Sequence, residues 1–317
     1  MKKICILTPV KNEEENIEDF LRAVQKLIVN EKEYLFEHIL IDNCSTDSTR
    51  QIIRRIILDF PHVGAIFNRR DFGSARSQLH ALKTVDADAV ILIAADFQEP
   101  IDLIENFLRE WERGHLIVGG IKESSSENFL LYFARSIFYK VLSSISEVKP
   151  LEGFIGFGLY DRVVLKELKG IDDSNPYFRG IPTDLGFNIK AIPYHQPLRV
   201  RGKSKAPILV LFEVAMNGIT SHSKAPIRLA SLLGSVFSFL SLMVGIGYFI
   251  YKIIFWNEFE IGIAPLIIFI TFASSLQILF IGLIGEYIAK INIQVTKRPL
   301  VVEEERINYP VKSPLNK

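Results

Sequence analysis

Two long apolar stretches near the carboxyl end constrain the fold of this 317-residue chain more than any other feature. Residues Ile227–Tyr251 carry no charge after Arg228, and residues Ile261–Ile284 carry none at all. Each stretch exceeds the about 20 apolar residues that an α-helix needs to cross a bilayer. Neither has a polar face, so the buried helix of a soluble core explains them less well. The sequence therefore predicts two transmembrane helices within residues 227–289.

Charged residues around this pair predict its orientation. The link from Lys252 to Glu260 has one lysine against two glutamates, whereas basic residues lie on both outer sides of the pair. They are Arg199, Arg201, Lys203, Lys205, Lys224 and Arg228 before the pair, and Lys290, Lys297 and Arg298 after it. Segments rich in Lys and Arg stay in the cytoplasm. We therefore expect a cytoplasmic amino-terminal domain (residues 1–205), a cytoplasmic tail (residues 290–317) and an external link.

Between the domain and the first crossing, residues 206–226 have an apolar face that Glu213 and Asn217 interrupt. This pattern predicts an amphipathic helix along the membrane surface. The tail beyond Arg298 is polar and contains prolines, so we expect it to be partly ordered at most.

Residues 1–205 alternate between strand and helix patterns. Apolar runs at residues 4–10, 38–43, 63–68 and 88–96 predict strands, and helical periodicity appears at residues 14–28, 45–60 and 74–85. The first run ends at Val10 and is too short for a signal peptide, so it is expected to be a buried strand. The alternation predicts an α/β fold with a mostly parallel sheet.

Polar residues follow several of the predicted strands. Lys11 and Glu13 come after the first, Asp42 after the second, and Asp96 to Glu99 after the fourth. Ligands bind beyond the carboxyl ends of strands in such sheets. Taken singly, each carboxylate is explained equally well as a helix N-cap, but several on one rim favour a ligand site.

Composition narrows the class of ligand. Lys plus Arg number 37 and Asp plus Glu 36, so the formal net charge is +1. This balance removes the electrostatic case for a general nucleic-acid binder, and we expect no nucleic-acid partner.

A series of motifs, in order along the chain, resembles the polyprenyl-phosphate glycosyltransferases of the dolichol-phosphate mannose synthase type, within glycosyltransferase family 2. The motifs are TPVKNEEENI, LIDNCSTDST, NRRDFGSARSQ, AADFQEP, GFGLYDR, YFRGI and RVRGKSKA, the last followed by the two apolar stretches. The resemblance implies a GT-A fold, a UDP- or GDP-linked sugar donor and a divalent metal, Mg²⁺ or Mn²⁺. It also implies an undecaprenyl or dolichyl phosphate acceptor at the cytoplasmic face of a membrane, and we expect the bacterial inner membrane.

The resemblance assigns roles residue by residue. The nucleotide-sugar site would comprise Pro9, Lys11, Glu13, Asp42, Ala95, Asp96, Arg199, Ser204 and Lys205. Asp96 and Gln98 would hold the metal, since Mg²⁺ commonly takes only one or two protein carboxylates. The family usually has Asp-x-Asp here, but the first position of this chain is Ala94. Lys11 replaces an aromatic residue of many relatives, which leaves the choice between UDP and GDP open.

Two basic features have two interpretations each. Residues 199–205 carry four positive charges that either rest on anionic lipid or close over the diphosphate. Arg135 lies in the apolar segment FLLYFARSIFYKVL, where it either binds the acceptor phosphate, as in the resembled family, or extends from an interfacial helix into the headgroups.

The catalytic base is the second departure from the family. Relatives often carry Asp-Phe-Arg where this chain has Gly156, Phe157 and Gly158. A phosphate monoester has a second pKa near 6 and is mostly dianionic at neutral pH, so a phosphate acceptor needs little help from a base. For a hydroxyl acceptor the loss would matter, and Glu152 and Asp184 are then candidate bases; each is otherwise a surface carboxylate.

The leading hypothesis is a membrane-bound, inverting hexosyltransferase that moves a sugar from a nucleotide sugar onto polyprenyl phosphate. One alternative is transfer to a hydroxyl of a lipid-linked glycan. The other is a non-catalytic, membrane-anchored nucleotide-sugar binder, because Ala94, Gly156 and Gly158 occupy active-site positions of the family. Metal-dependent turnover separates the last from the first two. Small residues in the apolar stretches, such as Gly245 and Gly247, would also allow a homo-oligomer.

Overall fold

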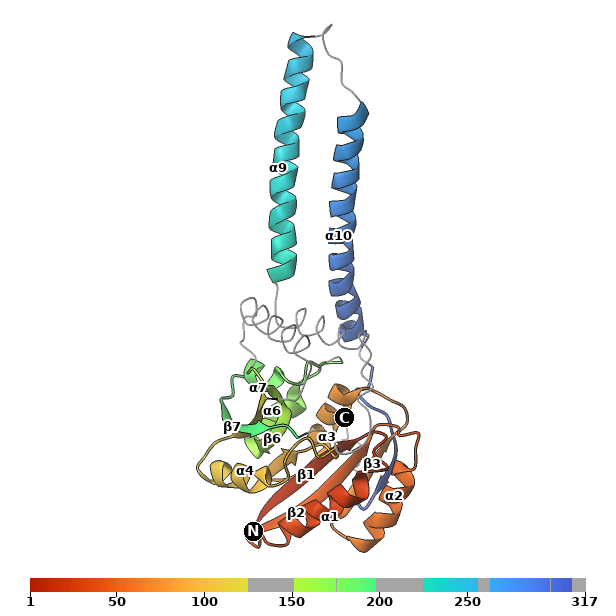
Figure 1. Ribbon diagram of the computed structural model, residues 1–317, viewed down its shortest axis with the longest axis vertical. Coiled ribbons are helices and arrows are strands. Elements are labelled where there is room, and N and C mark those ends of the chain that lie inside the picture. The colour runs from red at the N-terminus through yellow and green to blue at the C-terminus, as the bar shows by residue number, and fades with distance from the viewer. Residues whose placement is uncertain (125–150, 175, 198–224, 256–262, 297, 310–317) are drawn as a thin grey trace.

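The computed structural model describes residues 1–124, 151–174, 176–197, 225–255, 263–296 and 298–309. A three-layered α/β domain contains both described ends of the chain, and two long helices stand side by side at one end of it (Figure 1). The fold class predicted from the sequence, a GT-A-like domain with a mostly parallel sheet and two apolar carboxyl-terminal helices, is confirmed.

One eight-stranded sheet forms the middle layer, in the order β7-β5-β6-β4-β1-β2-β3-β8. The strands are β1 (Lys2–Val10), β2 (Tyr34–Asp42), β3 (Val63–Asn68), β4 (Ala89–Leu92), β5 (Ile117–Ser124), β6 (Phe154–Asp161), β7 (Ile189–His195) and β8 (Glu303–Ile307). Strands β4, β1, β2 and β3 pair in parallel, and β5 pairs in parallel with β7. Only β6 and β8 run in the opposite direction among the described strands.

Helices cover both faces of this sheet because each has one apolar stripe. On one face lie α1 (Ile17–Ile28), α2 (Thr49–Ile56) and α4 (Leu103–Glu112), whose buried residues pack with Ile4, Ile6 and Phe67 of the sheet. On the other face lie α3 (Ser74–Thr84), α6 (Arg162–Gly170) and α7 (Ile181–Asp184), packed with Leu7, Ile39 and Ile41. A short 3₁₀ turn, η1 (Ile57–Asp59), follows α2.

The first four predicted strands and the three predicted helices are present, with shifted ends. Strand β4 ends at Leu92, four residues before the end of the predicted strand at Asp96. The chain turns sharply after this strand, and Phe97 adopts a left-handed φ of 57°. The turn carries the polar residues of this loop to the rim of the sheet.

The predicted transmembrane helices appear as α9 (Ala225–Ile254) and α10 (Ile263–Val295). They contain apolar spans long enough to cross a bilayer, Ala230–Tyr251 and Phe269–Val295, and neither span is buried in the protein. The described part of the chain thus leaves these spans uncovered, whereas the core helices of a soluble domain are mostly buried. Helix α10 continues well past Ile284, the end of the second apolar stretch. The amphipathic helix predicted at residues 206–226 lies outside the described residues except for its last two, which begin α9.

Residues 298–309 of the tail, which we expected to be partly ordered at most, form an ordered segment. After α10 the chain returns to the domain and adds β8 antiparallel to β3 at the edge of the sheet. Val301 is buried, and the Arg69 N–H donates to the carbonyl of Val302 at 3.0 Å. The polar composition of this segment suits an edge strand, because charged side chains on an edge oppose pairing with other chains.

Candidate active site

The carboxyl edge of the parallel strands carries the candidate site. Asp42 is the last residue of β2 and pairs in register with Val10, the last residue of β1. Asp96 follows β4, on the other side of β1. Neighbouring strands lie about 4.8 Å apart, so β2 and β4, which flank β1, run about 10 Å from each other. The loops that follow these strands form one rim.

The loop after β1 is bound to the loop after β2. The Asn12 N–H donates to Ser45 Oγ at 2.9 Å, and the Thr46 N–H donates to Asn12 Oδ1 at 2.8 Å. The Glu13 N–H donates to Thr49 Oγ1 at 2.9 Å, and the Glu13 side chain accepts a hydrogen bond from Asn16 at 2.7 Å. Pro9, another predicted site residue, lies within β1 opposite Ile41. The predicted residues of these two loops are therefore held together.

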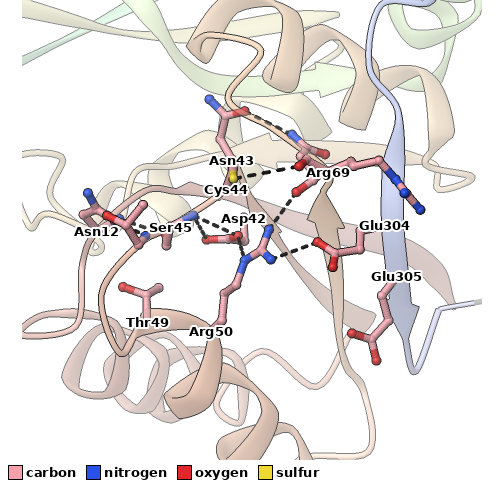
Figure 2. A network of polar contacts seen from close by, with 12 residues as sticks. Asn12, Asp42, Asn43, Cys44, Ser45, Thr49, Arg50, Arg69, Glu304 and Glu305 are labelled. Atoms are coloured by element: carbon pink, nitrogen blue, oxygen red, sulfur yellow. Dashed lines mark hydrogen bonds and ion pairs between the residues drawn. The ribbon is translucent and has the colours of Figure 1, made fainter.

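Asp42 is fully buried and forms an ion pair with Arg50 of α2. Arg50 Nε lies 2.6 Å from Asp42 Oδ2, and both carboxylate oxygens accept the Ser45 N–H at 3.2 Å (Figure 2). Through these contacts Asp42 fixes the turn between β2 and α2. We predicted Asp42 as part of the nucleotide pocket but assigned no role to Arg50.

Asn43, Asp71 and Lys11 link the loops after β2, β3 and β1. Asn43 Nδ2 donates to Asp71 Oδ1 at 2.6 Å, Lys11 pairs with Asp71, and the Gly73 N–H donates to Asp71 at 2.9 Å. Burial alone would raise the pKa of Asp71, but these donors hold it below its ordinary value. Lys11 therefore lies on the rim, as predicted, and is directed toward Asp71.

Asp96 occupies a tight turn together with Gln98. The Gln98 N–H donates to Asp96 Oδ1 at 3.1 Å, and Asp96 is half-buried between the fully buried Ala95 and the half-buried Phe97. The two predicted metal ligands thus come from one turn, and both side chains carry the oxygen atoms that Mg²⁺ prefers as ligands.

Glu99 binds the backbone at Ala94, the position where the family usually has an aspartate. Glu99 Oε2 accepts the Ala94 N–H at 2.6 Å, and the glutamate is buried. The pKa of Glu99 is raised to about 8, chiefly by burial and also by the charge of Asp96, although the hydrogen bond from the Ala94 N–H lowers it. Glu99 therefore fastens the turn through the Ala94 N–H. We assigned no role to Glu99 from the sequence, although it stands in the motif AADFQEP close to Ala94.

The two candidate bases lie at exposed positions. Glu152 is in the turn before β6, at the same edge of the sheet as Asp96, and Asp184 ends α7. Within β6 itself, the two glycines at which relatives often carry an aspartate and an arginine leave little room for a side chain. A Cβ at Gly158 would lie 2.3 Å from the Val118 carbonyl oxygen, and one at Gly156 would lie 2.7 Å from the Phe178 ring. Gly156 also has a left-handed φ of 104°.

Four predicted site residues lie outside the described residues: Arg135, Arg199, Ser204 and Lys205. Their roles stay predictions. Sequence reasoning missed Arg50 and Asp71. Asp71 stands in the motif NRRDFGSARSQ and follows β3 at the same edge, which could have identified it.

Comparisons with known proteins show what the whole chain is similar to. The model of the family "Glycosyl transferase family 2" matches residues 5–169. The SfII prophage-derived bactoprenol glucosyl transferase of Shigella flexneri is 31% identical over 298 residues, which are 94% of this chain and 96% of that protein. The bactoprenol glucosyl transferase of Shigella phage SfV is 30% identical over 96% of this chain and 99% of its own. Among solved structures, glucosyl-3-phosphoglycerate synthase from Mycobacterium tuberculosis is 18% identical, with a TM-score of 0.44 over 69% of this chain and 78% of that one.

Proposed function

Because the chain belongs to glycosyltransferase family 2, we propose that it transfers a sugar from a nucleotide sugar to polyprenyl phosphate at a membrane surface. One observation carries the proposal. The relatives named bactoprenol glucosyl transferases align over almost the whole chain, and an alignment of 298 residues must include the apolar helices as well as the domain. A lipid-linked acceptor requires both parts.

The reaction needs the acceptor phosphate, the sugar and the diphosphate in line. An acceptor phosphate oxygen forms a bond to C1 of the sugar, the bond from C1 to the diphosphate oxygen breaks, and the nucleoside diphosphate leaves with the electron pair. Attack opposite the leaving group inverts the anomeric carbon. The acceptor is mostly dianionic at neutral pH, so positioning contributes more than proton removal. This chemistry suits a site where Gly156 and Gly158 replace a catalytic carboxylate and a guanidinium.

Asp96 and Gln98 would hold Mg²⁺ or Mn²⁺. Within the described residues, no group of three or more His, Cys, Asp or Glu side chains could enclose a metal. The remaining ligands would then be diphosphate oxygens and water, an arrangement that Mg²⁺ commonly adopts. When bound, the metal neutralises negative charge that develops on the leaving diphosphate. The rim formed by Lys11, Asn43 and Asp71 would receive the nucleoside.

We also propose a cytoplasmic domain at the inner membrane of a bacterium. Strands β3 and β8 belong to one sheet, so the chain on either side of the apolar helices lies on the same side of the bilayer. An even number of crossings is then required, and α9 and α10 supply two. The basic residues that flank the pair favour the cytoplasm for this side.

Radiolabel transfer tests the function. The full chain in detergent is mixed with undecaprenyl phosphate, Mg²⁺ or Mn²⁺, and labelled UDP- or GDP-sugars, and label is counted in the organic phase. We expect metal-dependent transfer from one donor, and a loss of about 100-fold or more in Asp96→Asn, as is typical when charge stabilisation at the reacting centre is removed. Asp102→Asn is the matched control, an exposed carboxylate at the N-cap of α4 in the same segment. Equal activity of Asp96→Asn and Asp102→Asn would contradict the role of Asp96.

A further inference from the structure

We propose that Glu304, in the strand after the membrane helices, is a positioning residue for the donor site and acts through Arg50 and Asp42. The proposal rests on the proposed function, since it assumes that the rim next to Asp42 receives the nucleotide.

Glu304 lies at an irregularity in the pairing of β8 with β3. Phe67 is opposite Glu305 and Asn68 is opposite Glu303, so Glu304 is the extra residue between two paired ones. A bulge of this kind redirects a side chain that regular pairing would place elsewhere. The Glu304 carboxylate lies 2.9 Å from Arg50 Nη1 (Figure 2).

Arg50 joins the carboxyl ends of two strands. Its Nε binds Asp42 at the end of β2, and its Nη2 donates to the carbonyl of Asn68, the last residue of β3, at 2.6 Å. Glu304 occupies the third side of the guanidinium (Figure 2). Because a guanidinium is planar and rigid, three acceptors fix both its position and its orientation.

The ends of β2 and β3 lead directly into the rim. Asn68 Nδ2 donates to Asn43 Oδ1 at 3.2 Å, and Asn43 in turn donates to Asp71, the partner of Lys11. A guanidinium that rotates away from its third acceptor would loosen these loops together. We therefore expect loss of Glu304 to weaken nucleotide binding and to leave the chemical step itself largely unchanged.

Arg50 itself is a poor target for the test. Its side chain is 18% exposed and that of Asp42 is fully buried, so removal of the arginine leaves a buried carboxylate without its counterion. The Glu304 side chain is 46% exposed, and its removal leaves the Arg50–Asp42 pair in place.

The neighbouring residue offers a matched control. Glu305 pairs with Arg54 of α2 at 2.6 Å, with side chains exposed to similar extents, 42% and 43%. This pair also attaches β8 to α2, but no described contact of Arg54 reaches Asp42 or Asn68. Glu304 and Glu305 thus lie on the same strand, carry the same charge and each pair with an arginine of α2. They differ because, in the described hydrogen bonds, only the arginine that pairs with Glu304 contacts the ends of β2 and β3.

The experiment is isothermal titration of the full chain in detergent with UDP and, separately, GDP, each with Mn²⁺. Wild type, Glu304→Ala, Glu304→Gln and Glu305→Ala are compared, and the thermal unfolding of each is measured. For the nucleotide that wild type binds, we expect Glu304→Ala to raise Kd about 10-fold. Glu304→Gln, which keeps an oxygen acceptor for Arg50, should recover part of the affinity, and Glu305→Ala should stay within about 2-fold of wild type.

A KM and kcat measurement with the matching nucleotide sugar completes the test. A higher donor KM with kcat within about 3-fold of wild type is expected for Glu304→Ala. Equal Kd values for Glu304→Ala and Glu305→Ala, or losses that follow the fall in melting temperature in both, would overturn the proposal. Wild-type protein that binds neither nucleotide would contradict the proposed function itself, and that result is read from the wild type alone.

Discussion

His38, in the middle of β2, is the clearest case of a buried titratable side chain outside the rim. Its Nε2 lies 2.9 Å from Thr8 Oγ1, and its Nδ1 lies 3.3 Å from the Gln25 amide, which also contacts His62. The pKa of His38 is lowered from 6.5 to about 3, chiefly by burial and also by the neighbouring His62. The folded domain therefore holds His38 as a neutral imidazole.

This shift predicts that the folded state loses stability as the pH is lowered. Between pH 6.5 and about 3 the unfolded chain binds a proton at His38 that the folded chain excludes. The contribution of neutral His38 to the unfolding free energy is fully present above pH 6.5. It falls by up to about 1.4 kcal/mol per pH unit as the pH drops through that window. Thermal unfolding at about pH 7 and about pH 5 should show a smaller drop in Tm for His38→Gln than for wild type. The exposed His115→Gln is the control, and parallel drops in all three proteins would contradict the account.

Single residues differ in how far the sequence predicts them. Asp42 and Asp96 were predicted because each follows an apolar strand, and the carboxyl ends of parallel strands share an edge. Arg50 was not predicted, because a helical arginine has the same local pattern whether it faces solvent or a buried aspartate. The contact of Glu99 was not predicted either, because its hydrogen bond with the Ala94 N–H depends on the turn at Phe97.

Strands β5 and β6 come close to each other where the family often carries larger side chains. Gly158 pairs with Gly119 of β5 and with Leu92 of β4. The space next to its Cα is filled by the backbone of Val118, which cannot move without shifting the strand. The absence of a side chain at Gly158, where relatives often carry an arginine, is thus built into the packing of the sheet.

Substitution at this position tests the packing. Gly158→Ala places a Cβ 2.3 Å from the Val118 carbonyl oxygen, so we expect a loss of about 1–3 kcal/mol in unfolding free energy. Gly170→Ala is the matched control at the end of α6, where a Cβ meets nothing within 4 Å, and should be neutral or stabilise by up to about 1 kcal/mol. Denaturant unfolding measures both; equal stabilities of the two variants would show that the strands separate easily.

Elements with strong local patterns were predictable, and elements defined by distant partners were not. Strands β1 to β4 alternate with amphipathic helices and could be read from periodicity. Strand β8 has the sequence EEERI, which lacks an apolar alternation, and its partner β3 is near the other end of the chain. Its pairing with β3 and the contacts of Arg50, Arg54 and His80 with its three glutamates explain why this segment is ordered.

At the scale of the whole molecule, the sheet contains strands from both sides of the helix pair. Strands β1 to β7 precede α9, and β8 follows α10. The chain thus leaves the domain before α9 and returns to it after α10 (Figure 1). The site and the tail must therefore face the same compartment.

Cysteine labelling tests this topology. In a Cys44→Ser background, where the remaining Cys5 is buried, a single cysteine is introduced by Asn257→Cys in the link or by Leu58→Cys on the domain, where the leucine is 82% exposed. A membrane-impermeant maleimide should label Asn257→Cys in intact bacterial cells, and Leu58→Cys only after the cells are opened. Labelling of Leu58→Cys in intact cells would contradict the cytoplasmic location.

The central claim is transfer to a lipid phosphate, and the choice of acceptor tests it most directly. The purified chain is given the donor it uses, the metal, and either undecaprenyl phosphate or undecaprenol, which differ only in the phosphate group. The account predicts one labelled lipid and one released nucleoside diphosphate per turnover with the phosphate, and no product with the alcohol. Product from the alcohol, or donor hydrolysis without any labelled lipid, would contradict it.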